Sequence, residues 1–160
     1  MSQTQPFTKL SSFNFQGENL PVSLVETIQV ISGVECDVYK FDTDPSKDLG
    51  IIRVGPGSKT PLQKVLTGDK TIEGYIQGKG TLTVTKANGE KTVYKVDEDS
   101  GQFSTNVDVG EQMQWQAADD SNLVFYEVCS PPYKDGRFQN IELVDELQLV
   151  LKPLNAEKQV

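Results

Sequence analysis

The sequence of 160 residues contains no histidine. Histidine is the side chain most often used as a general acid or base near neutral pH, and it is the commonest protein ligand for transition metals. Its absence excludes Ser-His-Asp and Cys-His catalytic mechanisms and every metal site that needs an imidazole. Any chemistry must therefore use carboxylates, lysine, arginine, tyrosine, cysteine or a cofactor.

Cysteine is almost as scarce, since only Cys36 and Cys129 are present. Two cysteines are too few for a disulfide framework, and a zinc site built from thiolates alone needs about four sulfurs. Two interpretations stay open: one disulfide or, as we expect, two buried thiols that are not bridged. Unbridged thiols are typical of the reducing cytoplasm, which is the compartment that we expect.

Basic residues are the minority, because 15 Lys and Arg face 23 Asp and Glu, for a formal net charge of −8. Nucleic acids and anionic membranes are bound by clustered Lys and Arg, so we expect neither as a partner. The longest uninterrupted apolar run is Leu123–Tyr126, which is far too short to span a bilayer. No charged start followed by an apolar stretch occurs in residues 1–20, so we also expect no secretory signal.

Alternation of apolar and polar residues at period two, which is typical of half-buried strands, recurs along the chain. Gly, Asn, Asp and Pro separate the alternating segments, and Asn88-Gly89 predicts a type I′ β-hairpin. Short strands at this regular spacing predict an all-β sandwich or barrel. The predicted strands are Val34–Phe41, Leu49–Val54, Thr71–Gln77, Thr81–Lys86, Lys91–Val96, Phe103–Thr105, Gln112–Gln116 and Leu123–Cys129.

The length fits a single domain, residues 1–160, because no linker, repeat or low-complexity tract divides the chain. We expect a barrel core over about 34–129, with extensions at 1–33 and 130–160. Two segments stay ambiguous: Val22–Val30 is a short helix or an early strand, and Ile141–Leu151 is a short helix or an added strand.

A segment in the middle of the chain resembles the first conserved motif of the cupin family. That motif has a Pro-Gly turn, five residues, a His-x-His pair, and then a Glu followed after six residues by Gly. Here the turn ends at Gly57, Gln63 and Val65 stand at the two His positions, and Glu73 is followed after six residues by Gly80.

A second, looser match comes later in the chain, where the family's Gly-x-x-His sequence supplies the last metal ligand. Gly110 is followed here by Met113 in place of the histidine. The resemblance covers about 34–129 and implies a cupin-type double-stranded β-helix, or jelly-roll barrel, with a short C-terminal extension. It also implies a homodimer as the assembly, which would cover sheet edges that an open barrel leaves unpaired.

The departures from the family motif decide the expectation about metals and cofactors. The three histidine positions hold Gln63, Val65 and Met113, which leaves only Glu73 of the usual four ligands. One carboxylate, one amide and one thioether do not make a competitive site for iron, manganese or zinc. We therefore expect no metal and no other cofactor.

Strand alternation extends the candidate site beyond the motif positions. If Glu73 points into the barrel, Tyr75 and Gln77 point the same way, and Met113 shares an inward face with Trp115. Such polar groups beside an indole suit a small polar ligand such as a sugar derivative. The alternative is plain core packing by Met113 and Trp115. The predicted ligand-binding set is Gln63, Glu73, Tyr75, Gln77, Met113, Trp115, Tyr133 and Arg137.

The last two members of that set lie in the segment that follows the barrel. It contains Pro131-Pro132-Tyr133 and then Arg137-Phe138, and it looks like a tail found in some small cupins. The prolines force an extended exit from the last strand, after which Tyr133 and Arg137 fold back over a barrel mouth. In the alternative, the aromatic residues only seal an open end of the core.

Fold does not choose function, because cupins range from metal dioxygenases to isomerases, epimerases and seed storage proteins. Our first hypothesis is a metal-free cupin that binds a small polar ligand without turning it over. The second is a metal-independent isomerase or epimerase with Glu73 as the base and Tyr75 as the acid. The third is a non-catalytic interaction module with a relic pocket, in which Val65, Met113 and Trp115 fill the barrel. The volume and polarity of the space around Glu73 separate the third hypothesis from the first two.

Overall fold

The computed structural model describes residues 9–66, 70–132 and 138–140, and every regular element in these ranges is a strand. The all-β prediction is confirmed. The strands are β1 (Ser12–Phe15), β2 (Glu18–Ile31), β3 (Val34–Phe41), β4 (Asp48–Val54), β5 (Gln63–Val65), β6 (Lys70–Gly78), β7 (Gly80–Thr85), β8 (Lys91–Val96), β9 (Ser104–Val107), β10 (Gln112–Ala117), β11 (Leu123–Ser130) and β12 (Phe138–Asn140).

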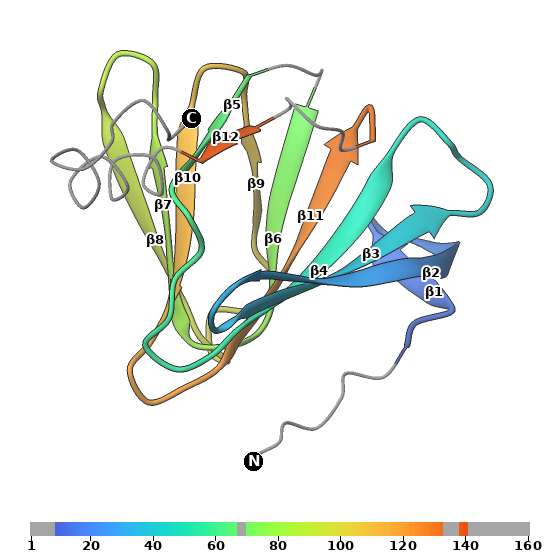
Figure 1. Ribbon diagram of the computed structural model, residues 1–160, viewed down its shortest axis with the longest axis horizontal. Coiled ribbons are helices and arrows are strands. Elements are labelled where there is room, and N and C mark those ends of the chain that lie inside the picture. The colour runs from blue at the N-terminus through green and yellow to red at the C-terminus, as the bar shows by residue number, and fades with distance from the viewer. Residues whose placement is uncertain (1–8, 67–69, 133–137, 141–160) are drawn as a thin grey trace, which may run out of the picture.

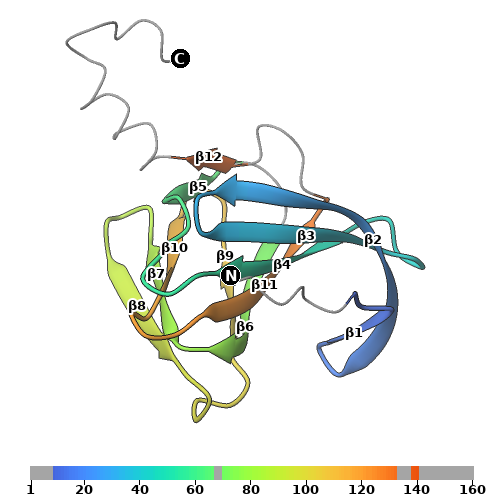
Figure 2. The same cartoon turned by 60° about the horizontal axis from the view of Figure 1, so that its bottom comes forward.

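Two antiparallel sheets face each other. One has seven strands in the order β1-β2-β3-β4-β11-β6-β9, and the other has five in the order β12-β5-β10-β7-β8. Figures 1 and 2 show the sheets close together at one end of the molecule and diverging toward the end where β5 and β12 lie. Late strands pair with early ones, β11 with β4 and β10 with β5, as in a jelly roll.

The eight strands predicted from alternation are all present, with ends that differ by at most two residues. The ambiguous segment Val22–Val30 belongs to the long strand β2, which pairs with β3 from Val22 to Ile31. The short strands β1, β5 and β12 were not predicted. The predicted extension 1–33 contains β1 and β2, and both belong to the seven-stranded sheet.

The hairpin between β7 and β8 is present, but the predicted type I′ turn is wrong. Gly89 has a φ of +92°, whereas Asn88 is not among the residues with positive φ. The Gly89 N–H donates to the Lys86 carbonyl and the Lys86 N–H donates to the Glu90 carbonyl, both at 2.8 Å. These bonds close a three-residue loop with glycine in the left-handed position, which twists the strands as a two-residue type I′ turn would.

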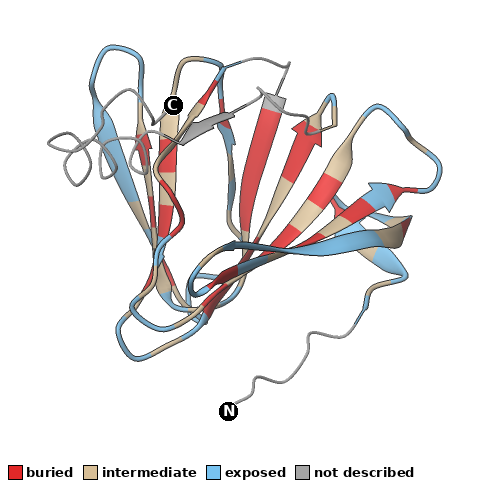
Figure 3. Cartoon of the chain, in the orientation of Figure 1, coloured by how far each residue is buried: buried red, intermediate tan, exposed pale blue. Residues whose placement is uncertain are grey.

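Two apolar clusters stabilise the fold, one on each face of the seven-stranded sheet, and Figure 3 shows its strands β4 and β11 buried or half-buried along their length. Neighbouring residues belong to different clusters: Ile51 and Val124 to the outer one, Ile52 and Phe125 to the one between the sheets. In the part of the chain that the structure describes, no helix is long and apolar enough to cross a membrane. The segment Ile141–Leu151 lies outside the described residues.

The turn from β6 into β7 fixes the end of the strand that carries Glu73. Gly78 has a φ of +93°, and a Cβ atom placed on it would lie 1.9 Å from the Asn122 carbonyl oxygen. Gly89 has almost the same φ, yet a Cβ atom there would meet nothing within 4 Å. The two glycines therefore share one conformational requirement and differ in the space around them.

We expect Gly89→Ala to lower the free energy of unfolding by about 1–2 kcal/mol, because only the left-handed backbone is penalised. Gly78→Ala should cost about 2–5 kcal/mol, since the overlap with a backbone carbonyl adds to the same penalty. Urea denaturation followed by tryptophan emission measures both values. Equal losses in the two variants would contradict the close approach at Gly78.

Candidate functional site

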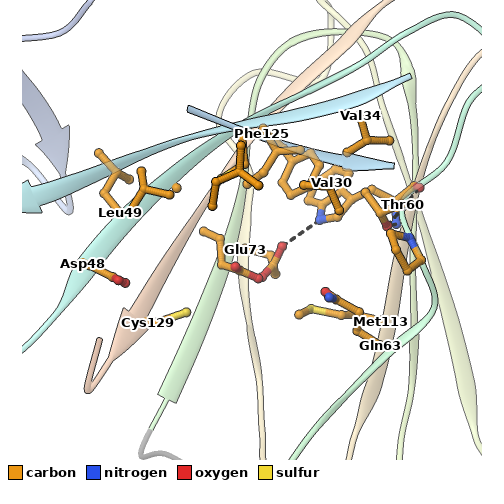
Figure 4. A pocket seen from close by; sticks show the side chains of 18 of the residues that line it. Val30, Val34, Asp48, Leu49, Thr60, Gln63, Glu73, Met113, Phe125 and Cys129 are labelled. Atoms are coloured by element: carbon orange, nitrogen blue, oxygen red, sulfur yellow. Dashed lines mark hydrogen bonds between the residues drawn. The ribbon is translucent and has the colours of Figure 1, made fainter. Parts of the chain in front are cut away.

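A cavity of about 570 Å³ opens between the two sheets. Its size is typical of pockets that bind small molecules. Trp115 of β10 and Phe125 of β11 stand at its boundary with the filled part of the interior, with their rings stacked at 4.3 Å and an interplanar angle of 12°. Figure 4 shows the lining side chains converging from strands of both sheets.

The centre of the site is Glu73 on β6, whose side chain is completely buried. Its Oε1 accepts a hydrogen bond of 2.8 Å from Nε1 of Trp115, drawn as the dashed line in Figure 4. No described N–H or O–H group donates to Oε2 of Glu73. The carboxyl group faces the cavity, so one of its oxygens depends on a proton or a ligand for a partner.

Glu127 on β11 lies directly opposite Glu73 in the antiparallel register and also lines the cavity. Burial raises the pKa of Glu73 well above its usual range, and the charge and hydrogen bonding of Glu127 raise it further, against the smaller effect of the Trp115 N–H. These effects favour the protonated, neutral form of Glu73. When Oε2 carries the proton it is a donor, and Glu127 is the acceptor beside it.

Glu127 was missed by the sequence reasoning, although a signal for it was present. It is the one charged residue in the predicted strand Leu123–Cys129, which is otherwise apolar apart from a tyrosine hydroxyl. A carboxylate in such a strand points to a polar interior. Its position opposite Glu73 could not be predicted, because that depends on which strands pair and in which register.

Four of the eight residues predicted to bind a ligand line this cavity: Gln63, Glu73, Met113 and Trp115. Gln63 and Met113 are register partners on β5 and β10, so two of the motif positions meet across a strand pair. The inward direction predicted for Glu73 and Met113 agrees with the structure. Their role in ligand binding stays a prediction. Val65, the other motif position, is buried in the apolar cluster between the sheets.

The inference that Gln77 shares the inward face of Glu73 is wrong. A bulge in β6 breaks the alternation, because Tyr75 pairs with Phe125 whereas Gln77 pairs with Val124, which leaves Ile76 as the extra residue. Val124 belongs to the apolar cluster on the outer face of the sheet, so Gln77 follows it to that side. The Gln77 side chain is exposed and does not line the cavity.

The Tyr75 side chain points between the sheets, as predicted, but it does not lie in the cavity beside Glu73. Its ring packs against the apolar cluster between the sheets, and its hydroxyl donates to the Gly78 carbonyl at 2.8 Å. It does not line the cavity, so the predicted pairing of Tyr75 as acid with Glu73 as base is not what the structure presents. Tyr133 and Arg137 lie outside the described residues.

Neither Cys36 nor Cys129 forms a disulfide bond, as expected, and both line the cavity. Cys129 is buried as predicted, whereas Cys36 is only partly buried. Burial raises the pKa of Cys36 to about 12, and the Glu127 and Asp37 carboxylates add to the shift. Cys36 therefore remains a thiol at neutral pH, which makes it a weak nucleophile.

The residues at the family's metal-ligand positions do not fit a transition-metal ion. Val65 has no donor atom, and Gln63 and Met113 offer only an amide and a thioether. Glu73 already accepts the Trp115 N–H on one oxygen, and its surroundings raise its pKa and so favour its protonated form. Within residues 9–66, 70–132 and 138–140 no cluster of three or more His, Cys, Asp or Glu side chains is placed to hold a metal.

Acidic side chains are the only charged ones among the described residues of the lining. Glu26 comes from β2, Asp48 from β4, Glu73 from β6 and Glu127 from β11, and no described Lys or Arg joins them. The remaining walls are mainly apolar. The cavity therefore favours neutral or positively charged polar groups over anions.

Comparison with known proteins rests on structure alone, since no family model and no curated protein matches the sequence. An oxalate decarboxylase variant from Bacillus subtilis is similar with a TM-score of 0.61 and 19% identity, over 82% of this chain and 34% of that one. The capsular polysaccharide assembling protein CapF from Staphylococcus aureus is similar with a TM-score of 0.56 and 16% identity, over 76% of this chain and 32% of that one. A cupin-2 domain protein from Rhodospirillum rubrum is similar with a TM-score of 0.56 and 15% identity, over 96% of this chain and 97% of that one.

The chain thus spans about a third of the length of the oxalate decarboxylase and of CapF, and nearly the whole of the Rhodospirillum protein. Identities below a fifth carry the fold and not the activity. The jelly-roll topology, the motif around Glu73 and these structural similarities agree with one another. This all-β chain has the cupin fold.

Proposed function

We propose that this chain is a binding protein that holds a small polar ligand in the cavity between its sheets without a transition metal. The observation that carries the proposal is the buried Glu73 carboxyl group, which faces the cavity. No described group donates a hydrogen bond to its Oε2 atom. Burying such a group without a partner costs free energy, and a ligand that contacts it recovers part of this cost.

The character of the walls supports a ligand with both polar and apolar surface. Trp115 and Phe125 provide aromatic area, and Gln63, Glu73 and Glu127 provide the polar contacts. The indole N–H of Trp115 is already used by Glu73, so the tryptophan offers the ligand contact area and not a free donor. A ligand that contacts Glu73 would nevertheless alter the surroundings of the indole.

The open space around Glu73 argues against the interaction module with a filled barrel. A metal-independent isomerase or epimerase remains a second candidate, with Glu127 in place of Tyr75 as the partner of Glu73. Two adjacent carboxyl groups, one of them with a raised pKa, are a common arrangement for moving a proton between acid and base. This pair is the specific observation that favours the second candidate.

We expect a metabolite thermal-shift screen to yield a ligand that stabilises the wild type. A ligand at ten times its Kd adds about 1.4 kcal/mol, or about 3–6 °C in Tm. Glu73→Gln should weaken binding about tenfold, through loss of the contact with the Glu73 carboxyl group, and reduce the shift to about a third. Gln77→Ala is the matched control, because the β6 bulge places that side chain outside the cavity.

Emission of Trp115, the single tryptophan, follows the titration of the same ligand. A calorimetrically confirmed ligand that leaves the emission unchanged, and that binds Trp115→Phe and Glu73→Gln as tightly as the wild type, would place binding elsewhere. Incubation of the ligand with the protein in D₂O separates the two candidates. Incorporation of deuterium at carbon, lost in both Glu73→Gln and Glu127→Gln, would favour the isomerase.

The metal-free state is part of the proposal and has its own measurement. We expect elemental analysis of the purified protein to give less than about 0.1 iron, manganese, nickel or zinc per chain, because the donors at the family positions are weak. About one such metal per chain, lost in Glu73→Ala and retained in Gln77→Ala, would overturn this expectation.

A homodimer formed through the edge of β2 is also proposed. Beyond Val22, whose N–H donates to the Ser11 carbonyl, the described part of β2 pairs only with β3, which leaves its other edge unpaired. The Val25 side chain beside this edge is 58% exposed. An unpaired edge with an apolar side chain is a surface that proteins generally cover. A second copy of this chain is the occupant that the proposal names.

Sedimentation equilibrium at micromolar concentration should give twice the 17.7 kDa mass of one chain. Val25→Lys places a charge at the edge and should shift the mass toward that of one chain. Val93→Lys is the matched control, since Val93 is equally exposed on β8 of the other sheet. A wild-type mass of one chain would refute the dimer.

A further inference from the structure

We propose that the cavity binds a primary ammonium group between Glu73 and Glu127 and releases one proton as it does so. The inference rests on the proposed function, because it names the chemical class of the ligand for the same cavity. It is carried by the placement of two carboxyl groups opposite each other on neighbouring strands, one of them completely buried with an oxygen that has no described donor.

The register brings these two groups together. Residues directly opposite each other in an antiparallel pair have Cβ atoms about 4.5–5.5 Å apart, and two like charges there destabilise the sheet. Glu73 and Glu127 are such a pair, and both line the cavity. A proton or a bound cation between the two carboxyl groups relieves this repulsion.

No described Lys or Arg side chain lines the cavity beside Glu73 and Glu127 to supply such a cation. On β9, next to β6, Thr105 is the register partner of Glu73 and does not titrate. Thr60, Gln63, Met113 and Trp115, on β5, on β10 and in the segment before β5, carry no charge either. The titratable groups that face the cavity are Glu26 of β2, Cys36 of β3, Asp48 of β4, Glu73 of β6, and Glu127 and Cys129 of β11.

In the unliganded protein a proton fills this role. The burial of Glu73 and the neighbouring Glu127 raise the pKa of Glu73, which favours a proton on Glu73 when no cation is bound. The Trp115 N–H remains on Oε1, which directs Oε2 toward the cavity and Glu127. The proton is thus held at the place where a positively charged donor would have the same two acceptors.

Binding is an exchange of one positive charge for another. The ammonium N–H groups donate to Oε2 of Glu73 and to the Glu127 carboxylate, and the proton of Glu73 passes to a buffer base in the solvent. No covalent bond to carbon changes, and the net charge of the cavity stays the same. An alcohol cannot make this exchange, because it brings no charge to replace the proton, and a carboxylate would add a second negative charge beside Glu127.

Three probes of one shape test the inference: cyclohexylamine, cyclohexanol and cyclohexanecarboxylate. They share a ring that suits the aromatic wall and differ only in the charge of the substituent. By titration calorimetry we expect the amine to bind at least tenfold more tightly than the alcohol and the carboxylate not to bind. Repeating the titration in buffers of different ionisation enthalpy should show about one proton released per amine bound.

The pH dependence has a definite sign. Because the free site holds a proton that the complex lacks, the Kd of the amine should fall by up to tenfold for each unit of pH. This range ends where the free Glu73 itself ionises. The amine stays protonated over about pH 6 to 8, since alkylammonium groups titrate near 10. The titrations are therefore made at about pH 6, 7 and 8.

Isosteric variants locate the proton. Glu73→Gln keeps an acceptor for the Trp115 N–H but cannot release a proton, so amine binding should weaken at least tenfold and lose its pH dependence. Glu127→Gln should also weaken binding at least tenfold. Glu90→Gln removes one negative charge from the exposed β7–β8 loop and should bind the amine as the wild type does. Thermal unfolding of each variant checks that it is folded. The number of protons released per amine bound is measured on the wild type, so that test does not depend on any variant.

The outcomes separate this inference from the proposed function. Equal binding of alcohol and amine without proton release, or binding of the carboxylate, overturns the ammonium site and leaves a ligand cavity in place. If none of the three probes binds, but the metabolite screen yields a ligand whose binding is weakened in Glu73→Gln, the ammonium site is likewise overturned and the ligand cavity remains. Absence of any ligand in both experiments overturns the inference and the proposed function together.

Discussion

One hydrogen bond joins the two sheets at the edge of the cavity, and the rest of the site depends on it. Trp115 lies on β10 of the five-stranded sheet, and its N–H donates to Glu73 on β6 of the seven-stranded sheet. The same indole stacks on Phe125 of β11, a contact worth about 0.5–1.5 kcal/mol beyond its buried area. The indole belongs to the apolar cluster between the sheets and also lines the cavity, so it separates the two.

The bridge also determines how the buried acid is tolerated. An ionised carboxylate moved into the interior without a partner costs several kcal/mol, so burial and the neighbouring Glu127 favour the protonated form of Glu73. Because the pKa of Glu73 is higher in the folded protein than in the unfolded chain, this group favours folding most at low pH. The contribution is lost progressively as the pH rises from about 4.3 through the folded pKa. The fold thus carries a local cost near neutral pH that a cationic ligand would offset.

Most of the fold could be predicted from the sequence, because a half-buried strand needs apolar and polar residues in alternation and this period is visible in the sequence. Segments such as Val34–Phe41 and Lys91–Val96 were predicted with their observed ends. The site was less accessible, since single-residue irregularities move side chains between faces. Ile76 is the clearest case: this one inserted residue sends Gln77 to the outer face. Glu127 illustrates the other obstacle, because long-range register places it opposite Glu73 and no local pattern encodes that pairing.

The family motif predicted which sequence positions line the cavity better than it predicted which chemical groups occupy them. Gln63, Glu73 and Met113 line one cavity as the resemblance implies, although the donors differ from those of metal-binding cupins. Replacing histidines by an amide and a thioether would leave an apolar hole if nothing else changed. Here a second carboxyl group faces Glu73, and repulsion between two like groups in direct register is relieved by a proton or a cation between them. The cavity therefore keeps the Glu73 position of the family motif and sets a second acidic group opposite it.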